Sequence, residues 1–500
     1  MIVSEKNISI LGNFLLALCA VILLSELWGI SYTTGDDLYL AIARHKEGGV
    51  FTVALNAAMT QGRFYQLLIY PLVQLPNLFE PFLALNIVRS VSNALPFLAF
   101  YFMAQQLFSH RVAKTASFIG IGLFAVTGSF NPFHTLPLWF NTNAFLLMLS
   151  IAFYHRRMMR NQSLILPSAL YFSSLLFYES FLLYLPVFAA IYWHACGRNN
   201  LSSSIKNQII ATLKANRPML VAVATYLVLY GAFRANFFKP EVVGSGLTLS
   251  LAPTSEIIRT IIKFSLGGIA MKIKLPTLDE ILGLGGAFSV ILVLGLSSVL
   301  FFTRQKESPA FLRMPLGWLV LVYCACAPNI LYAFTERYRD WVIHDSCYIG
   351  SYYSAYAIAL GLALIVTGEF SSPGRIRANW GVYVSMLAAF ALASMLNFNT
   401  TQSYFNEKRQ DALHWSAMQQ AIPALKQSNI MQLCSETFVT HTNEAQYWSY
   451  YLKGMMARDM QVRLLPNIAQ HCDAYIEYKV SDDLGLIRIS AGTDVIFSNF

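Results

Sequence analysis

The sequence predicts an α-helical polytopic membrane protein that carries a small α/β domain at its C-terminal end. Apolar residues make up 56 % of the chain and charged residues only 12 %, whereas soluble domains average roughly 45–50 % and 25 %. The apolar residues come in runs of about 17–25, the length of a helix that spans a bilayer. From about residue 397 the composition turns polar, which predicts a second domain outside the membrane.

Hydropathy and length predict about eleven transmembrane helices. Their approximate ranges are 8–30, 82–107, 112–130, one ending at 155, 164–177, 181–194, 219–233, 281–302, 316–334, 349–366 and 380–396. The first is expected to stay attached as an anchor, because its apolar run is too long for a cleaved signal peptide. The apolar segment 64–75 is short and contains Pro71, so we expect it at the interface or as a re-entrant piece.

The charge pattern fixes the expected topology. The net charge is +9, but most basic residues fall in short loops between spans, which is the positive-inside bias rather than a nucleic-acid signal. This bias predicts a cytoplasmic N-terminus, with the loop 31–63 and the C-terminal domain on the outer face. The inner-loop residues are Arg111, Lys114, Arg156, Arg157, Arg160, Arg198, Lys206, Lys214, Arg217, Arg304, Lys306, Arg313, Arg375 and Arg377.

The predicted domains are 1–397, which is transmembrane, and 398–500, which is α/β. In the tail the pattern predicts helices at 404–427 and 443–457 and strands at 430–434, 462–465, 474–480, 486–490 and 494–497. Two of the seven cysteines, Cys434 and Cys472, lie in this polar part. A disulfide between them is expected if the tail faces an oxidising compartment. Cys19, Cys196, Cys324 and Cys326 lie in or beside spans and are interpreted as small apolar side chains.

The first loop opens with an acidic pair, Asp36 and Asp37, in the stretch TTGDDLY at 33–39. One interpretation is a solvated helix cap, since aspartate caps helices well. The other is a general base that deprotonates a hydroxyl, or a metal ligand. Adjacent carboxylates repel each other, which can raise the pKa of one of them.

Three further features on the outer side combine charge with aromatic neighbours. Glu179 lies at the tip of a predicted helical hairpin, where it is either a solvated turn residue or part of a site. Arg337 and Arg339 flank Tyr338, and Arg63 follows Gly62. Guanidinium groups suit phosphate, although pairing with nearby acids or with lipid headgroups is the alternative.

Other kinds of chemistry find no support in the sequence. The outer histidines, His134, His344, His414, His441 and His471, show no zinc-ligand spacing. There is no P-loop, no dinucleotide-binding GxGxxG and no GxSxG nucleophile motif. A dedicated metal site and a nucleotide-driven cytoplasmic enzyme are therefore not predicted.

The early Gly35-Asp36-Asp37, the later QGRF at 61–64, the number of spans and the polar outer tail together resemble the GT-C glycosyltransferases. The likeness is greatest to bacterial and phage serotype-converting O-antigen glucosyltransferases. The resemblance implies that a hexose, glucose in those enzymes, passes from a polyprenyl-phosphate carrier to a periplasmic glycan such as O-antigen. It also implies the bacterial inner membrane, lipopolysaccharide modification, and no nucleic-acid partner.

In the mechanism that this resemblance implies, Asp36 or Asp37 removes the proton of the acceptor hydroxyl. Arg63, Arg337 or Arg339 stabilises the departing phosphate, with Glu179 and Tyr338 carried over as binding residues. No organic cofactor is needed, and a divalent cation could assist. Five aromatic residues of the tail could stack on the acceptor sugars, although core packing is the commoner role: Trp415, Tyr447, Trp448, Tyr450 and Tyr451. The alternatives are an O-antigen polymerase and a transporter of lipid-linked glycans.

Overall fold

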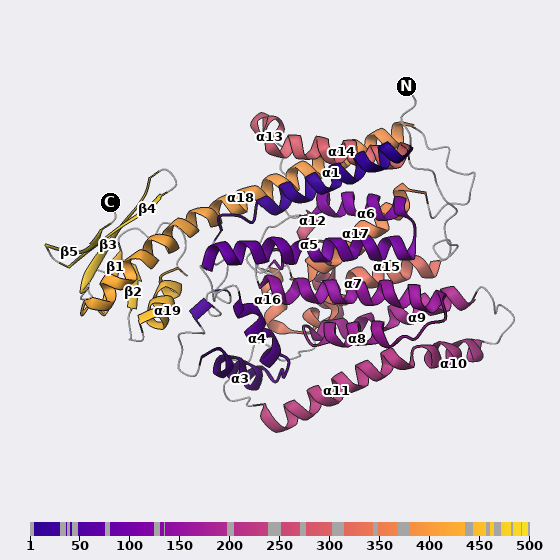
Figure 1. Cartoon of the computed structure of the whole chain (residues 1–500), viewed down its shortest axis with the longest axis horizontal. Helices are drawn as coiled ribbons and strands as arrows, with labels where there is room; N and C mark the ends of the chain where they lie inside the picture. The colour runs from indigo at the N-terminus through magenta and orange to yellow at the C-terminus, as the bar shows by residue number, and fades with distance from the viewer. Residues whose placement is uncertain are drawn as a thin grey trace. The chain divides into compact units, whose positions relative to one another are not determined.

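The structure of the chain is a computed structural model, shown in Figure 1. The structure describes residues 5–30, 37, 41–42, 49–75, 81–124, 131–134, 136–197, 205–238, 252–270, 277–302, 315–343, 349–368, 380–435, 444–456, 461–464, 472–481, 484–491 and 493–498. The chain divides into two compact units. We call them the helical unit (Met1–Leu27, Met59–Tyr65 and Val88–Ser403) and the tail unit (Trp28–Ala58, Gln66–Ile87 and Tyr404–Phe500).

The helical unit is a bundle in which the long apolar helices overlap predicted spans. Its complete helices are α1 (Glu5–Ser25), α6 (His110–Leu123), α7 (Pro137–Met159), α8 (Ile165–Leu175), α9 (Leu185–Gly197), α10 (Ile205–Ala215), α11 (Arg217–Phe237), α12 (Thr254–Ala270), α13 (Leu278–Leu282), α14 (Leu284–Phe302), α15 (Pro315–Ala333), α16 (Glu336–Ile343) and α17 (Ile349–Val366). A 3₁₀ helix, η2 (Glu179–Tyr184), precedes α9. Helices α6 and α15 both pack on α17, and α7 packs on α8.

The described residues include five helices that are long and apolar enough to cross a bilayer. They are 83–107, 217–237, 284–301, 349–366 and 381–427, and four shorter apolar helices accompany them at 10–25, 165–175, 179–193 and 317–333. The protein is therefore a multi-pass membrane protein. Two helices belong to both units, α5 (Pro81–Leu107) and α18 (Trp380–Gln427).

The chain does not break where the last predicted span ends. The sequence predicted a span at 380–396 and a separate polar helix at 404–427, but α18 is one helix of 48 residues. No glycine or proline occurs between Val382 and Ile422, so nothing ends the helix when its side chains turn from apolar to polar. Composition here marks a change of surroundings and not a change of secondary structure.

The tail unit contains a five-stranded sheet in its described part, with the order β2-β1-β3-β4-β5. The strands are β1 (Gln432–Ser435), β2 (Gln461–Leu464), β3 (Ala474–Ser481), β4 (Leu484–Ala491) and β5 (Asp494–Ser498), with α19 (Glu444–Met456) between β1 and β2. Strand β1 runs parallel to β2 and β3, and β3, β4 and β5 are antiparallel. Every strand lies within two residues of its predicted position. The unit also includes α3 (Gly49–Gln61) up to Ala58 and α4 (Gln66–Gln74), which holds Pro71.

Cys434 and Cys472 form a disulfide with Cα atoms 5.9 Å apart. The neighbouring Asp473 carboxylate accepts hydrogen bonds from the backbone N–H groups of Met431 and Gln432 at 2.8 and 2.9 Å. The disulfide and these bonds join the start of β1 to the start of β3.

The hydrophobic core of the tail unit includes two of the proposed sugar-stacking residues. Trp415 and Tyr451 are 8 % and 2 % exposed, and their rings meet edge to face with centroids 5.1 Å apart. The expectation that Trp415 and Tyr451 could stack on sugars is therefore wrong, because both pack in the core. The side chains of Tyr447, Trp448 and Tyr450 lie outside the described residues.

Candidate functional site

The candidate site begins at the turn that follows α3, where the sequence reads QGRFY. Gly62 has a φ of +67°, a left-handed conformation that residues with a Cβ rarely adopt. A Cβ at this position would also lie only 3.0 Å from a ring carbon of Phe238. Glycine is therefore required here, and it directs the next three residues into the helical unit.

The two aromatic residues of the turn fix it in place. The Phe64 ring packs on α11, with centroids 6.1 Å from Tyr226 and 6.3 Å from Phe233. Tyr65 is fully buried. Because both rings are held, the backbone of Arg63 between Gly62 and Phe64 is held as well.

Glu179, the first residue of η2, receives both polar side chains of this turn. Arg63 forms a salt bridge to Glu179 Oε1 through Nη2, and the Tyr65 hydroxyl donates a hydrogen bond to Oε2. Arg63 Nη1 also donates to Gln61 Oε1 at 3.3 Å. The Arg63 and Glu179 side chains are 18 % and 19 % exposed, so Glu179 is not a solvated turn residue.

The electrostatics keep the cluster in one protonation state. Burial is the largest influence on Arg63 and lowers its pKa, but the Glu179 carboxylate and three neighbouring tyrosines together raise that pKa well above its ordinary value. Burial raises the pKa of Tyr65 well above its usual range, although Arg63 opposes the shift. At neutral pH, therefore, the guanidinium is charged and the phenol remains a proton donor.

The guanidinium keeps donors for another ligand. It has five N–H groups in a planar fork. Among the residues that the structure describes, two of the five are used, one on Gln61 and one on Glu179. The remaining donors can bind an anionic oxygen, and a planar fork matches the oxygens of a phosphate.

An aromatic rim adjoins the cluster and includes Tyr338. The Tyr178 ring centroid is 6.0 Å from Tyr332, which is 4.6 Å from Tyr338. Burial raises the pKa of Tyr178, and Tyr338 and Glu179 raise it further. Tyr338 also acts electrostatically on Arg63. The structure thus brings together three predicted site residues, Arg63, Glu179 and Tyr338.

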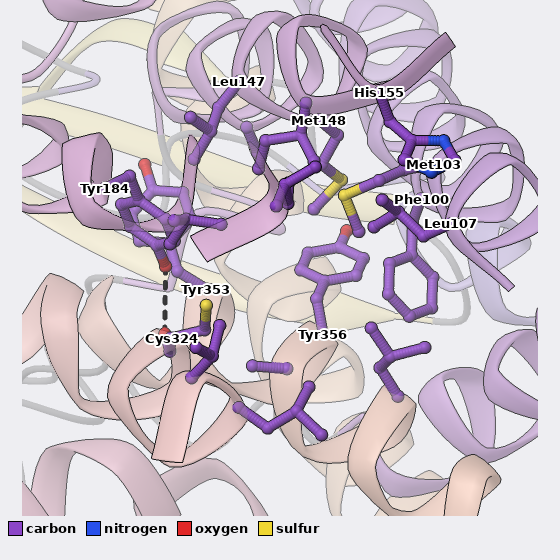
Figure 2. A pocket seen from close by; sticks show the side chains of 18 of the residues that line it. Phe100, Met103, Leu107, Leu147, Met148, His155, Tyr184, Cys324, Tyr353 and Tyr356 are labelled. Atoms are coloured by element: carbon purple, nitrogen blue, oxygen red, sulfur yellow. Dashed lines mark hydrogen bonds between the residues drawn. The ribbon is translucent and has the colours of Figure 1, made fainter. Parts of the chain in front are cut away.

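An apolar cavity of about 130 Å³ lies within the bundle (Figure 2). Its walls come from α5, α7, α9, α15, α17 and η2, and no Asp, Glu, Lys or Arg occurs among its described lining residues. Phe181 and Tyr184 line it, and they lie on the same 3₁₀ helix that begins with Glu179. Figure 2 shows Tyr184 and Cys324 at one end and His155 at the other. The polar cluster and an apolar space therefore share one short element.

The other predicted arginines have different surroundings. Arg339 is buried; its Nε contacts Glu256 Oε1 at 3.0 Å, and its Nη1 donates to the Ala333 carbonyl at 3.1 Å. The Arg337 side chain lies outside the described residues. Arg339 therefore ties α12 and α16 to the end of α15.

The acidic pair is described only in part. Asp36 lies outside the described residues, and Asp37 is 6 % exposed and belongs to the tail unit. In the described part of the chain, no group of three or more His, Cys, Asp or Glu side chains has the arrangement of a metal site.

Sequence reasoning missed two residues of the helical unit. Tyr65 directly follows the QGRF motif at 61–64, and its bond to Glu179 crosses 114 positions of sequence. Arg89 is fully buried in α5 and donates to the His134 carbonyl at 2.8 Å. A charged residue inside a predicted span was the available signal for Arg89, because such residues are rare and generally have a role.

Comparisons with known proteins were made at three levels. No protein-family model and no curated protein matches the sequence. Among solved structures, the apo oligosaccharyltransferase of Archaeoglobus fulgidus has a TM-score of 0.39 and 12 % identity, over 89 % of this chain and 64 % of that one. This chain thus spans less than two thirds of that protein.

A second similar structure is ArnT from Cupriavidus metallidurans. In the apo state it has a TM-score of 0.38 and 12 % identity, over 90 % of this chain and 84 % of that one. ArnT bound to undecaprenyl phosphate gives 0.37 and 13 %, over 90 % and 85 %. Scores of this size carry no argument about the chain, so the proposal below is based on its own residues.

Proposed function

We propose that this protein is an integral-membrane glycosyltransferase that moves a sugar from a polyprenyl-phosphate carrier to an acceptor glycan. The observation that carries the proposal is the contact of Arg63 and Tyr65 with Glu179, whose 3₁₀ helix also lines an apolar cavity. An amphipathic donor, with a phosphate next to a long isoprenoid chain, requires this pairing of a fixed cation and an apolar space.

Arg63 is the favoured phosphate ligand. Glu179 and Gln61 orient its guanidinium and leave three of its five donors for the substrate. Arg339 is the weaker candidate, because its guanidinium bonds to the Ala333 carbonyl and its side chain is only 8 % exposed, against 18 % for Arg63. Preorganised positive charge at this position favours departure of the phosphate, since negative charge develops there in the transition state.

The proposed reaction is a direct displacement. Asp36 or Asp37 takes the proton from the acceptor hydroxyl, and that oxygen forms a bond to the anomeric carbon. The bond between this carbon and the phosphate oxygen breaks, and the electron pair leaves with the polyprenyl phosphate. The proton then passes from the aspartate to water. A divalent cation is not required by this scheme, because Arg63 supplies the positive charge.

The finer assignment follows the resemblance in the sequence. The transferred sugar is a hexose, with glucose as the first candidate, and the acceptor is O-antigen or a related periplasmic glycan. The protein would lie in the bacterial inner membrane with its C-terminus in the periplasm. The basic residues of the predicted inner loops support this orientation.

The test is mass spectrometry of surface polysaccharide from cells that produce the wild type, Arg63→Gln, Asp36→Asn, Asp37→Asn or no protein. Membrane levels of each variant are measured in parallel. We expect the wild type to add one hexose per repeat, and we expect Arg63→Gln and one Asn variant, at equal abundance, to lose that addition.

Other outcomes would replace the proposal. A change of chain length or of surface amount, with the mass of the repeat unchanged, would indicate a polymerase or a transporter. If both Asn variants behave as the wild type, the acidic pair is a helix cap and not the base.

A further inference from the structure

The 3₁₀ helix η2 is fixed by side chains from outside it. The Tyr171 hydroxyl of α8 donates to the Phe181 carbonyl at 2.8 Å, and the Tyr323 hydroxyl of α15 donates to the Leu183 carbonyl at 2.5 Å. Hydrogen-bond geometry within 3₁₀ helices is poor. External donors therefore decide where this segment, and with it Glu179, is placed.

Tyr184, the last residue of η2, makes the reverse kind of bond: its own side chain donates to the backbone of α15. Pro328 lies inside α15 and has no N–H, so the Cys324 carbonyl four residues earlier lacks its usual helical donor. The Tyr184 hydroxyl donates to that carbonyl at 3.0 Å, as Figure 2 shows. Tyr184 is 6 % exposed, and at such a buried site an unbonded carbonyl is costly.

The next turn of α15 is held by two neighbouring helices. The Asn329 amide donates to the hydroxyls of Ser265 on α12 and Ser354 on α17, both at 2.9 Å. Both hydroxyls donate in turn to the Ala325 carbonyl, at 3.1 and 2.5 Å. Gly350 permits this approach, since a Cβ there would lie 1.5 Å from Asn329 Oδ1. The backbone around Pro328 is therefore fixed in the bundle.

We propose that Tyr184 is a positioning residue for Glu179, and that its anchor is the Cys324 carbonyl that Pro328 leaves without a helical donor. The proposal rests on the proposed function for the role of Glu179. Its chain of contacts runs from the fixed turn of α15, through the Tyr184 hydroxyl, to η2 and the Glu179 carboxylate that orients Arg63. Tyr184 itself is not expected to touch the substrate's reacting atoms.

The test is a double-mutant cycle of Tyr184→Phe and Pro328→Ala in the full-length protein in detergent. Phenylalanine removes only the hydroxyl, and alanine restores a backbone N–H that can reach the Cys324 carbonyl. Amide hydrogen exchange of residues 178–184 is the first readout. We expect Tyr184→Phe to speed exchange about tenfold, the size of one lost hydrogen bond, and we expect little change when Pro328→Ala is present.

The matched control is Tyr154→Phe. Tyr154 is buried like Tyr184, and its hydroxyl donates to Asn216 Oδ1 at 2.9 Å, a bond that does not involve η2. We expect this variant to leave exchange at 178–184 unchanged. For sugar transfer, we expect Tyr184→Phe to lower kcat about tenfold with KM nearly unchanged. We expect little further loss when Tyr184→Phe is added to Pro328→Ala, because the restored backbone N–H then occupies the Cys324 carbonyl in place of the Tyr184 hydroxyl.

The possible results separate this inference from the proposed function. If Tyr184→Phe does not alter exchange at 178–184, or alters it equally with and without Pro328→Ala, the positioning inference is wrong whatever the activity. If the exchange data show the expected coupling and the wild type transfers no sugar, Tyr184 still positions Glu179, and the proposed transferase function is what fails.

Discussion

Two arginine–glutamate pairs in the helical unit use the same chemistry in different surroundings. In the first, Arg63 and Glu179 are both largely buried, at 18 % and 19 % exposure. Both Glu179 oxygens are occupied, one by Arg63 and one by Tyr65. In the second pair, the Arg339 side chain is 8 % exposed, but Glu256 is 44 % exposed and reaches water.

The difference lies in what the guanidinium bonds to. In the first pair each carboxylate oxygen accepts a bond and the guanidinium donates only to side chains, so the acid orients the guanidinium. In the second pair the guanidinium bonds to the carbonyl of Ala333, the last residue of α15, where helical carbonyls lack intrahelical donors. The same residue types therefore orient a binding group in one place and close a helix end in the other.

The largest expected effect compares Glu179→Gln with Glu256→Gln. Glutamine keeps the shape of Glu179 but removes the charge that holds Arg63, and loss of one preorganised electrostatic group costs on the order of 10²–10³ in turnover. An exposed pair contributes only about 0–1 kcal/mol, so Glu256→Gln should stay within roughly fivefold of the wild type. The measurement is the initial rate of sugar transfer in membranes, normalised to protein. Equal losses in the two variants would remove the distinction between the pairs.

Much of the fold could be predicted because its signals are local. Strands β3, β4 and β5 alternate or cluster apolar residues between turn residues, and their positions were predicted within two residues. The continuity of α18 could not be read from composition, because polar residues such as those at 397–403 are compatible with both a helix and a linker. The packing of Trp415 on Tyr451 likewise depends on tertiary structure.

The site could be predicted only in pieces. Gly62-Arg63 and Glu179 each stood out locally, but 116 positions separate Arg63 from Glu179. Charge and spacing in one sequence do not tell which acid meets which base. Arg337 and Arg339 carried the same phosphate signal as Arg63. Only the structure shows that the Arg339 guanidinium bonds to a backbone carbonyl, whereas that of Arg63 bonds to side chains.

The second prediction concerns the helix-closing pair. Arg339→Gln leaves the Ala333 carbonyl without its charged donor, and hydrogen bonds to charged groups contribute roughly 1.5–3 kcal/mol. We expect a loss of that order in the free energy of unfolding, measured by denaturant titration in detergent. Transfer per folded molecule should persist. A fall in turnover at unchanged stability would instead make Arg339 a phosphate ligand.

The third prediction concerns Tyr65, the second hydrogen-bond donor to Glu179. Tyr65→Phe removes the hydroxyl that donates to Glu179 Oε2 and keeps the buried ring. A single hydrogen bond contributes about 1 kcal/mol, so we expect turnover to fall about fivefold, well short of the effect of Glu179→Gln. Rates measured for both variants at the same membrane level give the comparison. A fall as large as that of Glu179→Gln would mean that Tyr65, and not the charge on Arg63, is the main partner of the carboxylate.

The smallest expected effect is on the stability of the folded protein at alkaline pH, and it concerns only the pair that Tyr65 contacts. Burial raises the pKa of Tyr65 above its ordinary value of 10.0. The folded protein therefore holds this proton more tightly than the unfolded chain does, so the stabilisation is complete below pH 10 and is lost as pH rises through the folded-state pKa. Where only the unfolded tyrosine ionises, the slope approaches about 1.4 kcal/mol per pH unit.

Tyr65→Phe lacks this group, so its melting temperature should fall less steeply than that of the wild type between pH 10 and 11. The other buried tyrosines titrate in both proteins, so their contributions cancel in the difference in slope. Glu256→Gln changes neither Tyr65 nor its surroundings, and its curve should run parallel to that of the wild type. Parallel curves for all three proteins would show that the Tyr65 proton is no better held in the folded protein than in the unfolded chain. The hydroxyl could not then be a tight donor to Glu179.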